Sequence, residues 1–245
     1  MKKVLFTVAL CAFVAAPALA DFGTVSLREV NTSPGLGGFT LYAHNFTGGV
    51  GGVLAGRYNF DINGGSPSGI PGITSWTQLP EWGFCIEMQY STGGYQPYTI
   101  KNLQDAPLTG GIGGLPMGTT KANYIRELWA NHIANVPGNN TNAAAFQLAV
   151  WEIVYENNAA GPGLWNVKST SGAADTGFRA VGNTAALDLA NTWLGQLDGQ
   201  GLASGLYAYS NTNYQDYVFQ VPVPAAALLG FLGLSAAGLR LRRFA

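Results

Sequence analysis

Apolar segments that carry basic residues lie at both ends of the chain and leave the sequence between them as its globular part. The first segment begins with Lys2 and Lys3, continues as an apolar run over residues 4–14 and ends in small residues at Ala20. A charged start, an apolar centre and a small-residue end are typical of a secretory signal peptide. We therefore expect residues 1–20 to be removed by cleavage after Ala20 during export.

The second segment covers residues 221–245. It begins with Val221-Pro222-Val223-Pro224, continues as an almost wholly apolar stretch and ends with Arg240, Arg242 and Arg243. The apolar stretch is short against the roughly 20 residues that a helix needs to cross a bilayer core, so it spans one only if flanking residues join it. The arginine cluster would then hold the C-terminus in the cytoplasm. A buried terminal helix is the alternative, which the three arginines and the lack of a polar face disfavour.

These three parts, in this order, resemble the PEP-CTERM sorting signal of Gram-negative bacteria, which an exosortase reads. The family's usual Val-Pro-Glu-Pro is Val-Pro-Val-Pro here, with Val223 in place of the glutamate. This departure bears on processing more than on membrane targeting. The resemblance implies an exosortase-type processing enzyme as a partner and a transient anchor in the inner membrane. It also implies later release or transfer to the cell surface and its polysaccharide matrix.

The stretch between the two segments, residues 21–220, is long enough for one domain with a substantial core. It carries seven basic and thirteen acidic side chains, a net charge of −6. Nucleic acid and anionic membranes are therefore poor partners. The chain has 34 glycines, and Asn, Ser and Thr are frequent between its short apolar runs. This composition favours turn-rich β structure exposed outside the cell, as in extracellular matrix and adhesin proteins.

The expected order of elements is strands, helices, strands. Strands are expected over residues 24–30, 39–43, 53–62, 84–90 and 217–221 and around Tyr207 and Tyr209, with a turn at 31–35. Helical spacing of apolar residues is found over 122–134, from Thr141 or Asn142 as the N-cap to about Tyr155, and over 184–197. We therefore predict an α+β fold, mainly a β sandwich or barrel-like domain with an inserted helical segment, besides the N-terminal signal peptide and a single C-terminal hydrophobic helix.

Cys85 is the only cysteine left once the signal peptide is removed. The other, Cys11, lies in the apolar run, and a lipoprotein signal there is a weaker alternative because bulky Leu10 precedes it. A lone exported cysteine cannot form an internal disulfide, so Cys85 is inert, pairs with another molecule or reacts with a different partner. Strict alternation over residues 84–90 places Cys85 with Glu87 on one strand face, away from the more apolar face.

Gln147 is the candidate partner because it lies in an apolar helical run. Four apolar residues share its helix face, namely Ala143, Ala144, Trp151 and Val154. Burying an unpartnered primary amide there costs on the order of 1–3 kcal/mol, so the position requires an explanation. Either Gln147 hydrogen-bonds to a loop carbonyl, or its side chain condenses with Cys85 to form an internal thioester.

The thioester explanation has a definite chemistry. The Cys85 thiolate attacks the side-chain carbonyl of Gln147 and ammonia leaves. A pocket closed to water preserves the reactive acyl group. A lysine amine or a sugar hydroxyl of a partner then attacks the acyl carbon, which fixes the protein to its target through Gln147 and frees Cys85.

Two short motifs resemble the Cys-Gln thioester domain of bacterial surface adhesins. They are the aromatic-Cys-aliphatic strand Phe84-Cys85-Ile86 and the Gln-x-Ala-aliphatic-Trp helix Gln147-Leu148-Ala149-Val150-Trp151. The helix over 122–134 also resembles one in that family, and the likeness covers residues 79–155. The residue before the glutamine is often Thr in the family and is Phe146 here. The resemblance implies a Cys85–Gln147 thioester, with Phe84, Glu87, Phe146 and Trp151 as candidates for its pocket.

The remaining polar residues are less informative. Glu87 is equally consistent with a proton shuttle or amide partner for the thioester and with a solvated acid. His132 lies in a helical apolar stripe and is expected to be packed, whereas His44 stands alone. No spacing of His, Cys or acids indicates a metal, and no catalytic triad, phosphate loop or dinucleotide motif is found. We therefore predict neither a cofactor nor an enzymatic activity.

Two other functions are consistent with the sequence. The main alternative is a non-covalent matrix or carbohydrate-binding protein with an inert Cys85. Trp76 and Trp165, set among Gly, Ser and Asn, are its possible sugar platforms, and the other tryptophans are expected in the core. A hydrolase of the exopolysaccharide matrix needs two converging acids, and Glu81 and Glu87 are close in sequence but not otherwise marked as such a pair.

Overall fold

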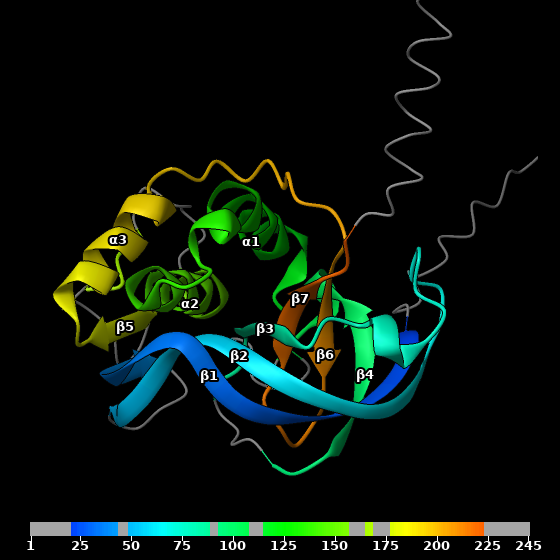
Figure 1. The fold of residues 1–245 in the computed structure, drawn as a ribbon. Coiled ribbons are helices and arrows are strands. Elements are labelled where there is room, and N and C mark those ends of the chain that lie inside the picture. The colour runs from blue at the N-terminus through cyan, green and yellow to red at the C-terminus, as the bar shows by residue number, and fades with distance from the viewer. Residues whose placement is uncertain are drawn as a thin grey trace, which may run out of the picture.

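The computed structural model describes residues 21–43, 49–88, 93–107, 115–156, 165–168 and 177–222. The expected signal peptide, His44 and most of the expected sorting segment, including Val223, Pro224, Arg240, Arg242 and Arg243, lie outside these ranges. The described residues form an antiparallel β-sheet with three α-helices, which confirms the α+β class (Figure 1).

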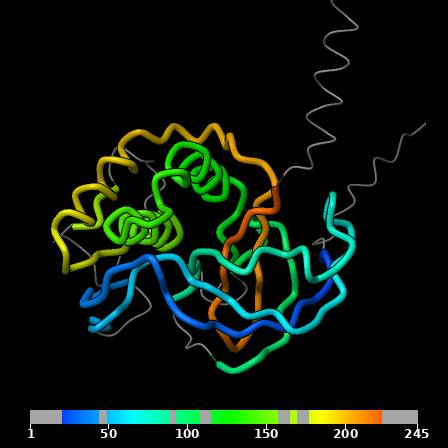
Figure 2. Tube along the Cα trace, in the orientation of Figure 1, coloured from blue at the N-terminus to red at the C-terminus, as the bar shows by residue number. Residues whose placement is uncertain are grey.

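Seven strands make up the sheet. They are β1 (Asp21–Ala43), β2 (Val50–Pro67), β3 (Trp82–Cys85), β4 (Gln96–Asn102), β5 (Phe178–Val181), β6 (Leu206–Ser210) and β7 (Tyr217–Gln220). Their order is β2-β3-β7-β6-β4-β1-β5, and β1 also pairs with β2. Six strands therefore form a closed, barrel-like ring, and β5 extends the sheet from the far end of β1. The C-terminal strands, orange in Figure 2, return beside the early strands.

The β1–β2 ribbon is longer than the sequence suggested. The expected turn at residues 31–35 does not interrupt it, because β1 is one continuous strand paired with β2 from Gly23 to Leu41. The register shifts between Thr32 and Gly35, so Pro34 lies in an irregularity of the ladder. Proline, which lacks an N–H group, is tolerated at such a bulge. The prediction of two separate strands was therefore wrong.

The helices follow the apolar periodicity of the sequence. They are α1 (Gly118–His132), α2 (Asn140–Tyr155) and α3 (Thr184–Leu194), with single 3₁₀ turns at η1 (Trp76–Gln78), η2 (Leu103–Asp105) and η4 (Ile133–Asn135). The N-cap of α2 is Asn139, whose side chain accepts from the Asn142 N–H at 3.0 Å, and not Thr141 or Asn142 as expected. Helix α3 ends three residues early, before Gly195.

Helix α2 occupies the centre of the molecule. Every residue from Ala143 to Tyr155 is buried. It packs against the β1–β2 ribbon on one side and against α1 and α3 on the other (Figure 1). A helix enclosed in this way can be apolar all round, which is why its sequence shows little contrast between faces.

The described fold runs from Asp21 to the start of the expected sorting segment. The Asp21 carboxylate accepts from Lys101 Nζ at 2.5 Å. At the other end, Val221 is buried and its N–H donates to the Gly205 carbonyl at 2.9 Å, whereas Pro222 is exposed. Val221 therefore packs with the domain. Within the part of the chain that the structure describes, none of the helices has the length and apolar character needed to span a membrane.

Candidate functional site

Cys85 is the last residue of β3. Its strand pairs with β7 at Phe84 and Cys85 and with β2 only at Trp82 and Gly83. The strand was expected to continue to Tyr90, and this was wrong. After Cys85 the chain leaves regular pairing with β7, although the next N–H, that of Ile86, donates to the carbonyl of Asp216 at 2.9 Å.

The alternation expected for this strand does not separate a buried face from a solvated one. Phe84, Cys85, Ile86 and Glu87 are all fully buried, because β3 is covered on both sides. The interpretation of Glu87 as a solvated acid is therefore wrong. Its carboxyl lies close enough to the Cys85 thiol for its charge to raise the pKa of that thiol.

Gln147 holds the main chain of Cys85 through both ends of its amide. The Cys85 N–H donates to Gln147 Oε1 at 2.9 Å, and Gln147 Nε2 donates to the Cys85 carbonyl at 2.7 Å. Both residues are fully buried. Since β2 does not pair with β3 at this point, the glutamine supplies the partners that a neighbouring strand would otherwise provide. The sequence distance of 62 residues is closed by helix α2 docking on the end of β3.

The thiol of Cys85 donates to the carbonyl of Glu87 at 2.9 Å. Burial raises the pKa of the thiol well above its usual range, and the charges of Glu87 and Glu29 add to this effect. The backbone of Glu87 and the indole of Trp151 oppose it and lower the pKa. The resting side chain is therefore the neutral thiol, and it must turn from Glu87 towards the Gln147 amide in order to react with it.

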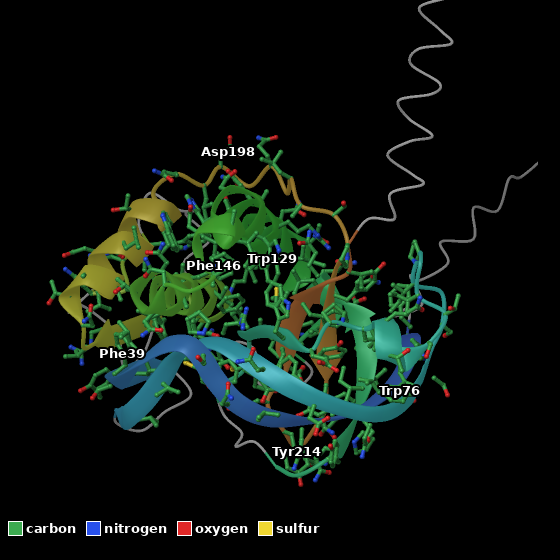
Figure 3. The ribbon with its side chains drawn as sticks, in the orientation of Figure 1. Phe39, Trp76, Trp129, Phe146, Asp198 and Tyr214 are labelled. Atoms are coloured by element: carbon green, nitrogen blue, oxygen red, sulfur yellow. The ribbon has the colours of Figure 1, made fainter. Side chains whose placement is uncertain are left out.

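Aromatic rings cover the contact between β3 and α2. Phe84 packs on Phe146 with ring centroids 4.5 Å apart and meets Trp129 edge-on at 5.8 Å. Trp129 and Phe146 lie next to each other, 5.6 Å apart (Figure 3). Phe146 thus contributes to an apolar wall beside Gln147. Such a wall excludes water from the Cys85–Gln147 pair.

Two further residues of α2 face the segment that follows β3. Trp151 and Tyr155 come four and eight residues after Gln147, so they lie on the same side of the helix. The Met88 N–H donates to the Tyr155 hydroxyl at 2.8 Å. Trp151 is buried, and its Nε1 has no hydrogen-bond partner among the described residues. Tyr155 was not anticipated, although its spacing from Gln147 was visible in the sequence.

The other groups around the thiol come from distant strands. Three buried tyrosines interact electrostatically with Cys85, namely Tyr58 of β2, Tyr98 of β4 and Tyr217 of β7. Burial is the main reason that their pKa values are raised. The Tyr217 hydroxyl also donates to Glu29 Oε2 of β1 at 3.4 Å. No local sequence pattern predicts that these side chains meet, because the pairing of distant strands in the closed ring brings them together.

The structure places the remaining candidates outside this site. His132 is buried and stacks on Trp193, with ring centroids 4.6 Å apart, which confirms that it is packed. Trp165 is buried against Tyr124, so the expectation of a sugar platform there was wrong. Trp76 is half-buried against the core, on the side of the sheet away from α3 (Figure 3).

Glu81 and Glu87 do not form the pair of converging acids that a hydrolase needs. Glu81 is exposed whereas Glu87 is fully buried. Across the described ranges, no group of three or more His, Cys, Asp or Glu side chains is placed to hold a metal ion. Comparisons of the chain with protein-family models, with curated proteins and with solved structures find no match.

Proposed function

We propose that this protein forms an internal thioester between Cys85 and Gln147 and uses it to attach covalently to a partner outside the cell. The observation that carries this proposal is the pair of hydrogen bonds, 2.9 and 2.7 Å long, by which the Gln147 amide holds Cys85 inside a dry site. A nucleophile and its electrophile must be held close together in a fixed orientation, and these bonds provide that.

The hydrogen bonds also prepare the amide for attack. The Cys85 N–H points at the carbonyl oxygen of Gln147, where negative charge develops when the sulfur adds to the carbon. The C–S bond forms, the C–N bond breaks, and the thiol proton leaves with the nitrogen as ammonia. Glu87, buried beside the thiol, is the carboxyl best placed to carry that proton.

The product is an acyl group that waits for a stronger nucleophile than water. An amine or hydroxyl of a surface polysaccharide or protein attacks the acyl carbon, a C–N or C–O bond forms, and the sulfur leaves. The protein remains joined to its target through the side chain of residue 147. No turnover follows, because each molecule reacts once; the protein acts as an adhesin or matrix component and not as an enzyme.

The two ends of the chain complete the proposal. The leader, residues 1–20, directs export, and the Pro-containing, apolar and basic tail anchors the chain in the inner membrane. An exosortase-type enzyme then passes the protein to the cell surface or the biofilm matrix.

The first test is the intact mass of the purified region from Asp21 to Pro222, measured beside its Cys85→Ala and Gln147→Ala variants. We expect the wild type to be lighter than its sequence by one molecule of ammonia, and both variants to have full mass. Full mass together with a titratable thiol in freshly purified wild type would remove the covalent function.

A second function, a non-covalent matrix or carbohydrate-binding protein, is favoured by one observation. The two hydrogen bonds to Cys85 already satisfy the Gln147 amide, so a purely structural role accounts for its burial. In that case the thiol is released intact on unfolding, and one thiol per molecule is titrated in denaturant. The thioester function instead requires that no thiol be titrated until the bond has been cleaved.

A further inference from the structure

We infer that Trp151 is the hydrogen-bond donor to the Cys85 sulfur while that sulfur carries negative charge. This inference rests on the proposed thioester function. It assigns one residue a role in both halves of the chemistry, namely the formation of the bond and its cleavage by a nucleophile.

The placement of Trp151 follows from its neighbours on α2. Gln147, one turn before it, holds the main chain of Cys85, and Tyr155, one turn after it, receives the N–H of Met88. The face of α2 that carries these three residues therefore lies along the segment from Cys85 to Met88. Trp151 occupies the middle of this face, beside the thiol.

The indole N–H of Trp151 needs an acceptor. The side chain is 1% exposed, and its Nε1 is buried without a hydrogen-bond partner among the described residues. Indole nitrogen is a donor only, and buried donors in folded proteins nearly always have a partner. Trp129 shows the ordinary arrangement, since its Nε1 donates to Gln220 Oε1 at 2.8 Å.

A thiolate at Cys85 is an acceptor that would satisfy this donor. The neutral thiol uses its proton on the Glu87 carbonyl, so the resting state gives the indole a weak acceptor. Once the proton is lost, the sulfur becomes an anion in a dry site, where a fixed donor is effective. The indole lowers the pKa of the thiol, as expected of a donor that stabilises the thiolate.

The indole transfers no proton in either step. During formation, the sulfur loses its proton, bonds to the Gln147 carbon and displaces the nitrogen, which leaves as ammonia. During attachment, an amine bonds to the same carbon, the C–S bond breaks, and the departing thiolate takes up the proton that the amine gives up. Trp151 stabilises the sulfur anion at the start of the first step and at the end of the second.

The test uses the full-length protein and three forms of it. Trp151→Phe removes the N–H and keeps an aromatic ring. Replacement of Trp151 by benzothienylalanine, which has sulfur in place of the N–H, keeps nearly the whole shape. Trp165→Phe is the matched control, because Trp165 is also buried and its Nε1 also has no hydrogen-bond partner among the described residues, but it packs against Tyr124, outside the site. For each form, intact mass gives the fraction that lacks ammonia and the rate at which that fraction reacts with methylamine and with water.

We expect both changes at position 151 to slow the reaction with methylamine about tenfold to a hundredfold, the usual effect of losing one hydrogen bond to a charged group. Trp165→Phe should react at the wild-type rate. If Trp151 had only a structural role, both changes would speed up the loss of the thioester, because a loosened pocket admits water and hydrolysis becomes faster. Wild-type rates or faster ones in the benzothienylalanine form overturn the assignment, even if Trp151→Phe does not fold. A wild type with full mass and a free thiol overturns the proposed function itself, and with it this inference.

Discussion

At the scale of single residues, Gln147 decides how the site is built. It is an amide within a helix that is otherwise packed on all sides by apolar groups, and its two hydrogen bonds go to one residue of another element. Before any reaction, a glutamine in this position joins α2 to the end of β3 through these hydrogen bonds. Its structural role can therefore be measured by itself in Cys85→Ala, a variant that cannot form the thioester.

In the Cys85→Ala background, Gln147→Ala is expected to lower the free energy of unfolding by about 2–5 kcal/mol, because it leaves the buried N–H and the buried C=O of residue 85 unpaired. Gln200→Ala, at an exposed glutamine, is the control and should change stability little. Urea unfolding followed by circular dichroism measures both. An equal, small effect of the two substitutions would show that the hydrogen bonds to Cys85 do not hold β3 against α2.

The sequence singled out the two residues that meet at the site, Cys85 and Gln147, but few of their neighbours. Cys85 stood out because it is the lone exported cysteine, and Gln147 because it is polar in an apolar run. Tyr155 could have been found from its eight-residue spacing on the same helix. Tyr58 and Tyr217 could not, because pairing between distant strands brings them to the thiol, and such pairing leaves no local signal.

At the scale of elements, helices were predicted better than strands. The three helices were found because apolar side chains at helical spacing give a signal within one segment. Strand β4 was missed even though Tyr98 and Ile100 alternate with less buried residues, because Pro97 at its start resembles a loop. Strand β1 was divided in two at Pro34, since the sequence cannot show that a register shift accommodates the proline.

Helix α2 also carries a buried acid near its C-terminal end. Glu152 Oε1 accepts from the N–H of Asn166 at 2.8 Å and so joins the helix to residues 165–168. Burial raises the pKa of Glu152 from 4.5 to about 8, and the charge of Glu156 contributes in the same direction. The folded protein therefore holds a proton on Glu152 at neutral pH that the unfolded chain has already lost.

This shift predicts how stability depends on pH. Because the folded state binds more protons than the unfolded state between about pH 4.5 and about pH 8, the free energy of unfolding should fall as the pH rises through this window. The total contribution is on the order of 3–5 kcal/mol. Glu152→Gln, which keeps an acceptor for Asn166, should flatten the profile and be more stable than the wild type at pH 8.

Urea unfolding at a series of pH values measures this dependence, with Glu81→Gln as the control at an exposed glutamate. The control should follow the wild-type profile. A Glu152→Gln profile as steep as that of the wild type would assign the pH dependence to other groups. Lys121, which donates to the carbonyls of Val154 and Glu156 at the same end of the helix, acts above this window. Burial lowers its pKa from 10.5 to about 8, so the unfolded state binds more protons between about pH 8 and about pH 10.5, and this group makes stability rise with pH there.

At the scale of the whole molecule, closure of the strand ring explains why the site is dry. β3 lies between β2 and β7, and the ring is completed by the pairing of β1 with both β2 and β4. The thiol, at the end of β3, is enclosed by the ring on one side and by α2 on the other. A reactive acyl group held there is protected by the fold as a whole.

The tail that follows the domain is expected to determine where the whole molecule resides. Val221 is buried in the domain, and the apolar and basic tail follows it in the sequence. Since we expect the tail to be an anchor and not a part of the domain, a chain that ends after Pro222 should have the same unfolding midpoint as the full-length protein. In a Gram-negative host, the full-length protein should fractionate with the inner membrane, and the shortened protein should be soluble outside it.

N-terminal sequencing of both forms should begin at Asp21, which separates a defect in export from a defect in anchoring. Replacement of Arg240, Arg242 and Arg243 by Ala in the full-length protein provides the matched control, because it keeps the apolar stretch and removes only the charges that fix its orientation. Should the shortened chain stay in the membrane fraction, the anchor would lie elsewhere in the protein. The proposal of a thioester would be unaffected by that result, since every group that it uses lies between Glu29 and Tyr217.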